Sequence, residues 1–177
     1  TREAGKRIRS SFEMFDRIKR LASGHRPRVN YPYDATITPM LRQVAGFIVG
    51  GFHAPVYHLT VGGWDDHSTL ADSGSGHTGR FATRVGRVAG NVKAFLDDLK
   101  AYGKEQDVVV LVYSEFGRRL GVNGAQGTDH GHGGVAYLAG VPVQAGVYGT
   151  YPDLTKATTP YTNWYPGYDQ TSTDLRS

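Results

Sequence analysis

Acidic and histidine side chains form two clusters, and each cluster follows a short apolar run of strand-like sequence. The first cluster comes directly after residues 56–61, and the second comes shortly after residues 108–113. The candidate metal ligands in the two clusters are Asp65, His67, Asp129, His130 and His132. Carboxylate and imidazole groups are the usual ligands of zinc and similar divalent ions. The residue types therefore predict one metal-centred pocket, with zinc as the first choice and magnesium, manganese or calcium as alternatives.

The two clusters share a pocket if the strands before them lie in one sheet. Residues 56–61, a helix over 80–102 and an apolar strand over 108–113 have the order of a right-handed βαβ unit. Because ligands collect outside the carboxyl ends of parallel strands, side chains that follow both strands can reach one ion. The predicted fold class is therefore α/β, with a mostly parallel sheet flanked by helices and residues 108–113 as a strand covered on both faces.

Other elements complete the expected organisation of the chain. Apolar residues recur at helical spacing from residue 3 to about 22, and Thr38 is the expected N-cap of a second helix. Two further short strands are predicted over residues 135–139 and 145–148. Three segments follow from this pattern: a basic N-terminal helix over 1–28, an α/β core with the metal site over 29–150, and an irregular Tyr-, Thr- and Pro-rich segment over 151–177.

Composition limits the classes of protein and partner that fit this sequence. The 177 residues include no cysteine, which excludes disulfides and thiolate metal sites, and no apolar run is long enough for a membrane span. The net charge is +4, and much of the excess lies in the first 28 residues. No recognition motif for nucleic acid accompanies that basic stretch, so we read it as a solvated helix face. Because the sequence starts at Thr1, we expect a cut end or a piece of a longer protein.

Several of the candidate residues also have a structural interpretation. Asp65 or Asp66 can cap a turn, as aspartate often does. Glu115 can form an ordinary salt bridge with a neighbouring arginine, Arg118 or Arg119. His130 and His132 are the hardest to explain structurally, because the glycine-rich string around them contributes little to packing.

Several motifs occur in a defined order along the chain. The main ones are Gly62-Gly63-Trp64-Asp65-Asp66-His67, Ser114-Glu115-Phe116-Gly117-Arg118-Arg119 and Gly127-Thr128-Asp129-His130-Gly131. Together they resemble the DUF1501 family, which belongs to the alkaline-phosphatase and sulfatase-like superfamily. Trp64 and Asp66 stand where the family usually has Phe and Thr. The resemblance covers roughly residues 30–177 and implies the C-terminal portion of a longer protein with a partial alkaline-phosphatase-like core.

The resemblance also implies roles for individual residues. A two-metal centre would take one ligand group from Asp65 and His67 and the rest from Asp129 and His130. Glu115 stands where the superfamily often has an acidic ligand, and Arg118 would meet an anionic substrate. The predicted catalytic residues are Glu115, Arg118 and Asp66. Family members are generally exported, so an extracytoplasmic location, periplasmic or secreted, is implied.

The leading functional hypothesis is a metal-dependent hydrolase, or the metal-binding part of one, acting on phosphate or sulfate esters. Its expected partner is an anionic small molecule or polysaccharide, and neither nucleic acid nor a membrane span is expected. A hydrolase of glycosidic or carboxylic ester bonds is one alternative. A non-catalytic polysaccharide-binding module is another, since the C-terminal segment is dense in aromatic rings: Tyr148, Tyr151, Tyr161, Trp164, Tyr165 and Tyr168. A scaffold remnant without activity is the third.

Overall fold

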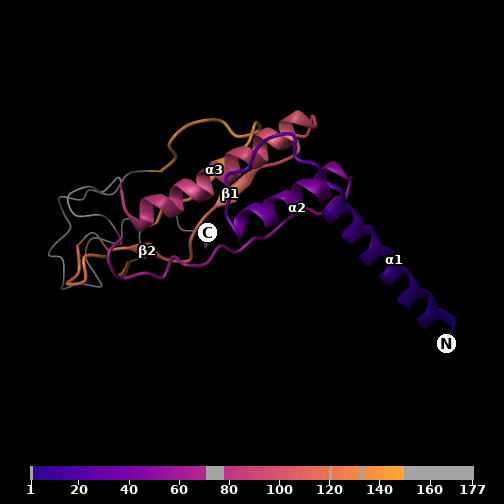
Figure 1. The fold of residues 1–177 in the computed structure, drawn as a ribbon, viewed down its shortest axis with the longest axis horizontal. Coiled ribbons are helices and arrows are strands. Elements are labelled where there is room, and N and C mark those ends of the chain that lie inside the picture. Colours follow the sequence, from indigo (N-terminus) through magenta and orange to yellow (C-terminus); the bar gives the residue numbers. More distant parts are fainter. Residues whose placement is uncertain (1, 71–77, 120, 132–133, 150–177) are drawn as a thin grey trace. The chain divides into compact units, whose positions relative to one another are not determined.

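A computed structural model describes residues 2–70, 78–119, 121–131 and 134–149 (Figure 1). Its elements are α1 (Arg2–Gly24), α2 (Ile37–Val49), α3 (Arg80–Ala101), β1 (Val110–Val112), β2 (Gly117–Arg118), β3 (His130–Gly131) and β4 (Tyr137–Ala139). The chain divides into two compact units. The helical unit contains the described residues up to 62 together with 85–108, and the loop unit contains the described residues of 63–84 and from 109 onward. Among the described residues, no helix is long and apolar enough to cross a membrane.

The first helix, α1, forms where the periodicity predicts it, but it buries none of its residues. Only its last turns approach α2. Leu21 lies against Gly46 and Gly50, and a Cβ on Gly46 would come within 2.6 Å of the Leu21 carbonyl oxygen. Arg17 donates a hydrogen bond to the Gly51 carbonyl oxygen at 3.4 Å. The close crossing of α1 and α2 therefore requires glycine at position 46, because any larger residue would carry a Cβ that collides with Leu21.

The second helix, α2, begins at Ile37, one residue before the expected N-cap, Thr38. Asp34 caps the helix instead, because its Oδ1 accepts the backbone N–H groups of Thr36 at 2.9 Å and Ile37 at 3.0 Å. The hydrogen bonds from Ile37 and Thr36 hold the pKa of Asp34 below its usual range. Thr38 lies buried in the first turn, with its hydroxyl 2.8 Å from Oδ1 of Asn91 on α3. The prediction that Thr38 is the N-cap was therefore wrong. The Asp34 carboxylate, and not the Thr38 hydroxyl, accepts the N–H groups at the start of the helix.

The core of the helical unit lies on α2 and α3. Its buried apolar residues are Ile37, Leu41, Val44, Ala45, Ala94, Phe95 and Leu99. The buried face of α3 also includes two polar residues, Asn91 and Asp98, which are fully buried. Phe81 and Val85, which the periodicity assigns to that face, are 43% and 41% exposed. The buried face of α3 is therefore partly polar, and each of its polar groups needs a hydrogen-bonding partner.

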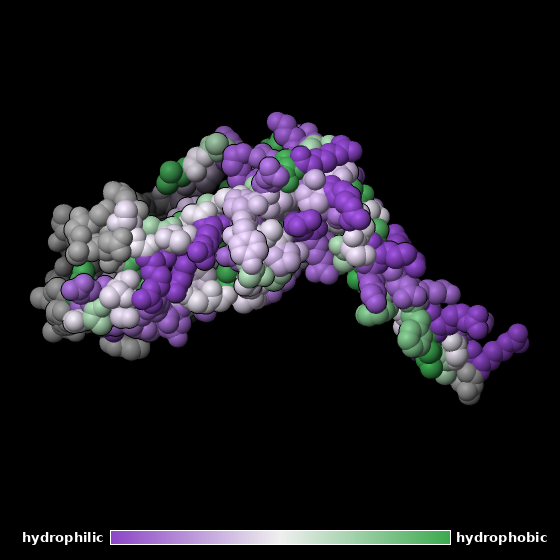
Figure 2. Space-filling view, viewed as in Figure 1, coloured by the Kyte–Doolittle hydropathy of each residue, from purple (hydrophilic) through white to green (hydrophobic). Residues whose placement is uncertain are grey.

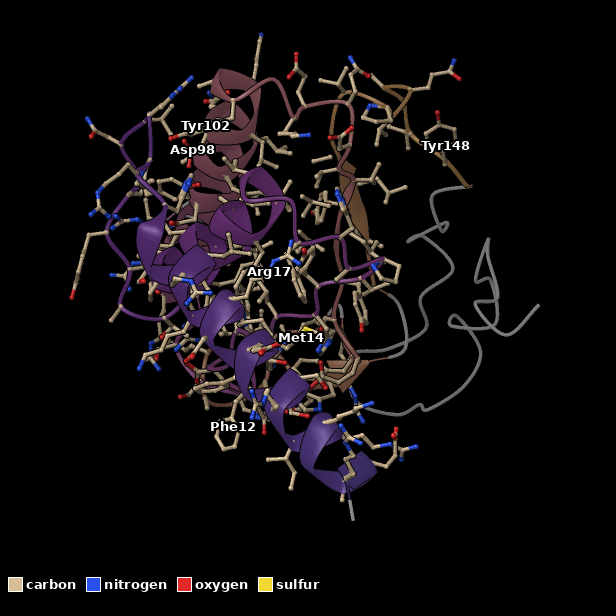
Figure 3. All side chains as sticks on the ribbon, turned by 90° about the vertical axis from the view of Figure 1, so that its right-hand side faces the viewer. Phe12, Met14, Arg17, Asp98, Tyr102 and Tyr148 are labelled. Atoms are coloured by element: carbon tan, nitrogen blue, oxygen red, sulfur yellow. The ribbon has the colours of Figure 1, made fainter. Side chains whose placement is uncertain are left out.

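Asp98 is the centre of a buried polar network in the helical unit. Its Oδ2 lies 2.7 Å from Nε2 of His25 and accepts the Tyr31 hydroxyl at 3.0 Å, while its Oδ1 accepts the Arg28 backbone N–H at 2.8 Å. The His25 side chain is only 3% exposed. Burial, and then the negative charge of Asp98, raise the pKa of Tyr31. The network ties the segment after α1 to α3, near Tyr102, and Figure 3 labels Asp98 and Tyr102.

The mostly parallel sheet predicted from the sequence is wrong. The described strands form only two antiparallel pairs, β1 with β4 and β2 with β3. In the first pair Val110 lies opposite Ala139 and Val112 lies opposite Tyr137. Residues 56–61 and 145–148 form no strand. The described part of the chain therefore contains no βαβ unit and no parallel α/β core of the alkaline-phosphatase kind.

The physical cause of this error is the non-local nature of strand pairing. An apolar run indicates that a segment can be buried, but a strand forms only where a second segment supplies its backbone hydrogen bonds. Val109 and Leu111 are 49% and 55% exposed, so β1 is not covered on both faces. The proposed segment boundaries at residues 28 and 150 stay predictions, and residues 151–177 lie outside the described residues.

Candidate metal centre

Two loops of the loop unit carry the acidic and histidine clusters, and hydrogen bonds join the loops. The Thr69 N–H donates to the Ala125 carbonyl oxygen at 3.1 Å. The Asn123 amide spans both loops, because its Nδ2 donates to the His67 carbonyl oxygen at 2.8 Å and to Oδ1 of Asp129 at 3.1 Å. The loops are thus held together by contacts that do not involve the imidazole rings.

Asp65, His67 and His130 form the candidate metal centre. Oδ1 of Asp65 lies 2.8 Å from Nε2 of His130 and 3.5 Å from Nδ1 of His67. One ligand atom from each residue lies within 4.8 Å of the other two. These three side chains are separated by up to 65 residues in the sequence. They are three of the five metal ligands that the sequence predicts.

Aromatic stacking sets the orientation of the His130 ring. Its centroid lies 3.9 Å from that of Phe116 with the planes 8° apart, and 4.7 Å from that of His67 with the planes 27° apart. Antiparallel pairing of β2 with β3 places His130 opposite Arg118. Strand pairing therefore fixes the backbone of His130, and the Phe116 and His67 rings fix the orientation of its imidazole.

The donor set is chemically suited to one divalent ion, and its ligand atoms lie within 4.8 Å of one another. Two imidazoles and one carboxylate are the protein ligands of several catalytic zinc sites, in which a fourth position stays open. Tetrahedral zinc places ligand atoms about 3.3 Å apart, so the hydrogen bond between Asp65 and His130 must lengthen by about half an ångström. The side chains of Asp65, His67 and His130 are 72%, 47% and 40% exposed. Solvent and a small substrate can therefore reach the candidate centre.

Two arginines brace the loops around the candidate centre. Arg118 donates through Nη2 to the Trp64 carbonyl oxygen and through Nη1 to the Thr128 carbonyl oxygen, the second at 2.6 Å. Arg119 donates through Nε to the His130 carbonyl oxygen at 3.2 Å. In this structure Arg118 therefore positions both ligand-bearing loops. Its predicted contact with an anionic substrate stays a prediction.

Asp66, a predicted catalytic residue, has two guanidinium partners. Its Oδ2 accepts Nη1 of Arg80 at 2.6 Å and lies 3.3 Å from Nη1 of Arg84, and its side chain is 14% exposed. Partial burial acts to raise the pKa of Asp66. The Ser68 N–H and the two guanidinium groups outweigh burial and hold the pKa below its usual range. Asp66 therefore anchors the first loop to the start of α3, and a catalytic role stays a prediction.

The lowered pKa of Asp66 predicts how acid affects stability. The carboxylate contributes stability fully above the unfolded-state pKa of about 3.9, and the contribution is lost as pH falls through the lower folded-state pKa. Asp66→Asn should therefore lower the free energy of unfolding at pH 7, and the difference from wild type should shrink once the pH falls below about 4. Urea unfolding between pH 2 and 7 measures it. Asp107→Asn, at an exposed pair with Lys104, is the control; a difference that persists unchanged at pH 2 would contradict the ion pairs.

The other predicted residues lie outside the three-residue centre. Asp129 accepts from Asn123 and lies 3.8 Å from Nη1 of Arg119. Glu115 is exposed and has no hydrogen bond or ion pair with the part of the chain that the structure describes. His132 lies outside the described residues. Asp129 therefore adjoins His130 in the sequence without being part of the centre, and Glu115 is not part of it either.

Two residues that shape the candidate centre, Phe116 and Asn123, were not predicted from the sequence. Phe116 stacks on His130, yet one aromatic residue after a strand has no distinctive pattern. Asn123 could have been recognised as an Asx turn, because its Oδ1 accepts the Ala125 and Gly127 N–H groups at 3.0 Å. Tyr148, the first of the aromatic residues considered for sugar binding, is 71% exposed, and the other five lie outside the described residues.

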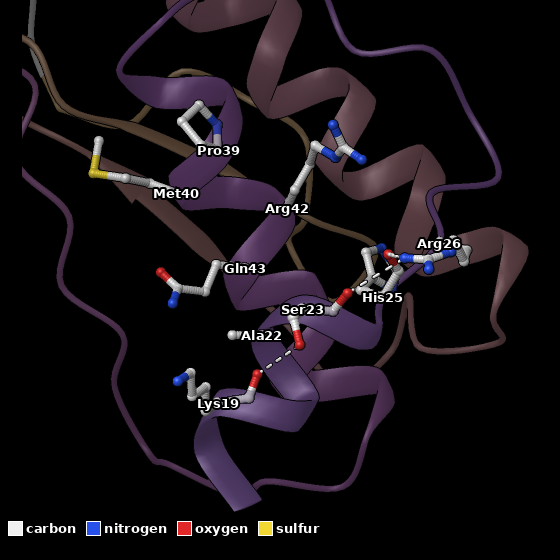
Figure 4. Close-up of a pocket in the computed structure, with 9 residues that line it drawn as sticks. All are labelled: Lys19, Ala22, Ser23, His25, Arg26, Pro39, Met40, Arg42 and Gln43. Carbon is white, nitrogen blue, oxygen red and sulfur yellow. Dashed lines mark hydrogen bonds between the residues drawn. The ribbon is translucent and has the colours of Figure 1, made fainter. Parts of the chain in front are cut away.

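A groove in the helical unit offers no second metal centre. It has a volume of about 520 Å³ and lies between α1 and α2. Lys19, Arg26 and Arg42 line it without any acidic residue. Figure 4 shows Lys19 at one end of the groove and Arg26 at the other, so the cationic groups do not converge.

Comparison with known proteins gives one result. The family model described as "Protein of unknown function (DUF1501)" matches residues 53–163. No curated protein and no solved structure matches the chain. The matched region includes all three residues of the candidate metal centre. Because the match covers more than half of the 177 residues, the chain belongs to the DUF1501 family.

Proposed function

We propose that this chain is a metal-dependent hydrolase, or the metal-binding part of one, that acts on phosphate or sulfate esters. The observation that carries the proposal is the grouping of Asp65, His67 and His130 ligand atoms within 4.8 Å of one another on an accessible surface. A bound zinc ion would supply a Lewis acid for an ester oxygen and would lower the pKa of a water molecule. The three protein ligands leave a coordination position for that chemistry.

The residues of the chain perform the remaining tasks in this proposal. The contact between His130 Nε2 and Asp65 Oδ1 must open before either atom binds an ion. Arg118 and Asn123 hold the two loops at a fixed spacing. Glu115 is exposed in the short segment between β1 and β2, where a carboxylate can exchange protons with substrate or water.

The relationship to alkaline phosphatases and sulfatases is part of the same proposal. It rests on the order of the motifs around residues 62–67, 114–119 and 127–131, and on the metal-ligand chemistry of their side chains. Zinc is the first choice of ion because two of the three ligands are imidazoles. On the same resemblance we propose an anionic ester as substrate and an extracytoplasmic site of action.

Metal binding and ester hydrolysis test the proposal together. Dialysis of the purified chain against zinc chloride, followed by elemental analysis, should give about one zinc ion per chain. The zinc-loaded protein should then hydrolyse 4-nitrophenyl phosphate or 4-nitrophenyl sulfate, and a chelator should stop the reaction. Turnover only of a 4-nitrophenyl glycoside or carboxylic ester would replace the proposed substrate class. Absence of both zinc and turnover would reject the hydrolase.

A further inference from the structure

The long helix α1 presents an uncovered apolar stripe. Residues 2–17 are all exposed. Ile8, Phe12, Met14 and Phe15 are between 54% and 67% exposed, although large apolar side chains usually lie against other apolar groups. Figure 3 shows Phe12 projecting from the side of the helix. A contiguous apolar surface of this kind marks an interaction site.

Charged residues are arranged around this stripe in a particular way. At about 100° per residue, Ile8, Phe12 and Phe15 share one face of α1. At the same spacing, Arg7 lies toward one border of that face and Arg9 toward the other, and Lys19 lies on the face itself near its C-terminal end. The other basic residues lie on the far side. Two of the three acidic residues, Glu3 and Glu13, also lie on the far side, and Asp16 lies at the border of the stripe beside Phe12. Figure 2 shows the hydrophobic side chains of α1 along one side of the helix and hydrophilic ones along the other.

The charge of α1 selects the kind of surface that can cover the stripe. The helix has seven basic and three acidic residues, hence a net charge of 7 − 3 = +4. Pairing of two α1 helices from separate copies would bring like charges together, which opposes association. A negatively charged partner is favoured, and it must be flat enough to contact a helix about 34 Å long.

Secondary structure gives a second reason for an external partner. Gly5, Ser10 and Ser11 are weak helix formers inside α1, and an amphipathic helix takes most of its stability from packing of its apolar face. Within α1, only Ile18, Leu21 and Ala22 are even partly covered. The first two-thirds of the helix therefore lack the packing that such a sequence requires.

We propose that α1 docks in the plane of an anionic phospholipid surface, with Phe12 and Phe15 inserted among the acyl chains. Basic residues at the borders of an apolar face, a strongly polar far side and low mean hydropathy are typical of interfacial helices. Arg7 and Arg9 have side chains long enough to reach lipid phosphates while their stems cover apolar surface. The docking face is independent of the metal centre, because α1 belongs to the helical unit and the centre to the loop unit.

Sedimentation of the full chain with vesicles tests the proposal. The chain should bind vesicles of phosphatidylglycerol mixed with phosphatidylcholine, bind vesicles of phosphatidylcholine alone much less, and be released by high salt. The double variant Phe12→Ser/Phe15→Ser should weaken partitioning roughly tenfold or more. Val147→Ser, which removes a 97% exposed apolar side chain from the loop unit, is the matched control and should bind like wild type.

Three results would overturn the proposal. One is equal binding of wild type and the Phe12→Ser/Phe15→Ser variant to the anionic vesicles. Another is a dimeric mass by light scattering that becomes monomeric in the same variant, since the stripe would then join two copies. The third is binding to soluble heparin without binding to vesicles, since the helix would then recognise a polyanion through charge alone. Circular dichroism and zinc binding of the variants check that each one folds.

Discussion

Replacement of His130 by alanine is expected to remove zinc binding from this chain. His130 supplies one of the three ligands that are grouped in the described part of the chain, and its Nε2 lies 2.8 Å from Oδ1 of Asp65. Loss of a residue that merely orients a metal ligand costs about 10- to 100-fold in affinity, so loss of a ligand should cost more than about a hundredfold. Isothermal titration of the apo chain with zinc chloride measures the change.

A matched control separates ligand loss from general damage. His58→Ala removes an exposed imidazole from the helical unit, which contains none of the three grouped ligands, and should leave zinc affinity unchanged. His130 also stacks on Phe116, so Phe116→Leu tests the packing contribution. We expect Phe116→Leu to weaken zinc binding less than His130→Ala, because the imidazole remains present. Equal zinc affinity in wild type and His130→Ala would show that these residues do not form the metal site.

Replacement of Asp98 by alanine is expected to give the largest loss of stability in the helical unit. The Asp98 side chain is fully buried, and it accepts hydrogen bonds from the Arg28 N–H and the Tyr31 hydroxyl beside the nearly buried His25. Removal of one partner from a buried polar network costs about 1–3 kcal/mol for each group that stays buried without a hydrogen bond, and Asp98 has several such partners. Urea unfolding followed by circular dichroism measures the free energy.

The neighbouring aspartate provides the control for this prediction. Asp97 pairs with Lys93 one turn earlier on the exposed side of α3, where its side chain is 46% exposed. Exposed pairs of this kind contribute at most about 1 kcal/mol, so Asp97→Ala should leave the unfolding midpoint nearly unchanged. Similar losses in both variants would mean that the His25–Asp98–Tyr31 network does not support the fold.

The candidate metal centre shows that residues predicted to lie together can be brought together by a different fold from the predicted one. The sequence predicted that Asp65 and Glu115 would follow two parallel strands and that the loop with His130 would fold back over the same edge of the sheet. In the structure they meet because β2 pairs with β3 in an antiparallel arrangement and Arg118 bonds to both loops. Glu115, which the same reasoning placed with them, is exposed and outside the centre.

The buried face of α3 shows a second limit of sequence reasoning. Periodicity located the helix correctly, since apolar residues at a spacing of three and four recur through it. It assigned Phe81 and Val85 to the covered face, whereas the structure covers Asn91 and Asp98. A polar residue can be buried when a distant segment supplies its partner, and His25 and Tyr31 lie about 70 positions away from Asp98.

The sequence by itself determined the three helices and the carboxylate and imidazole groups available for a metal ion. Helix formation depends on hydrogen bonds within one segment and on side chains three and four positions apart, so local spacing is enough to predict it. Only the tertiary structure decided how the strands pair, which polar groups are buried around Asp98, and that Asp65, His67 and His130 adjoin one another. These features depend on contacts between residues far apart in the chain, and local periodicity carries no information about such contacts.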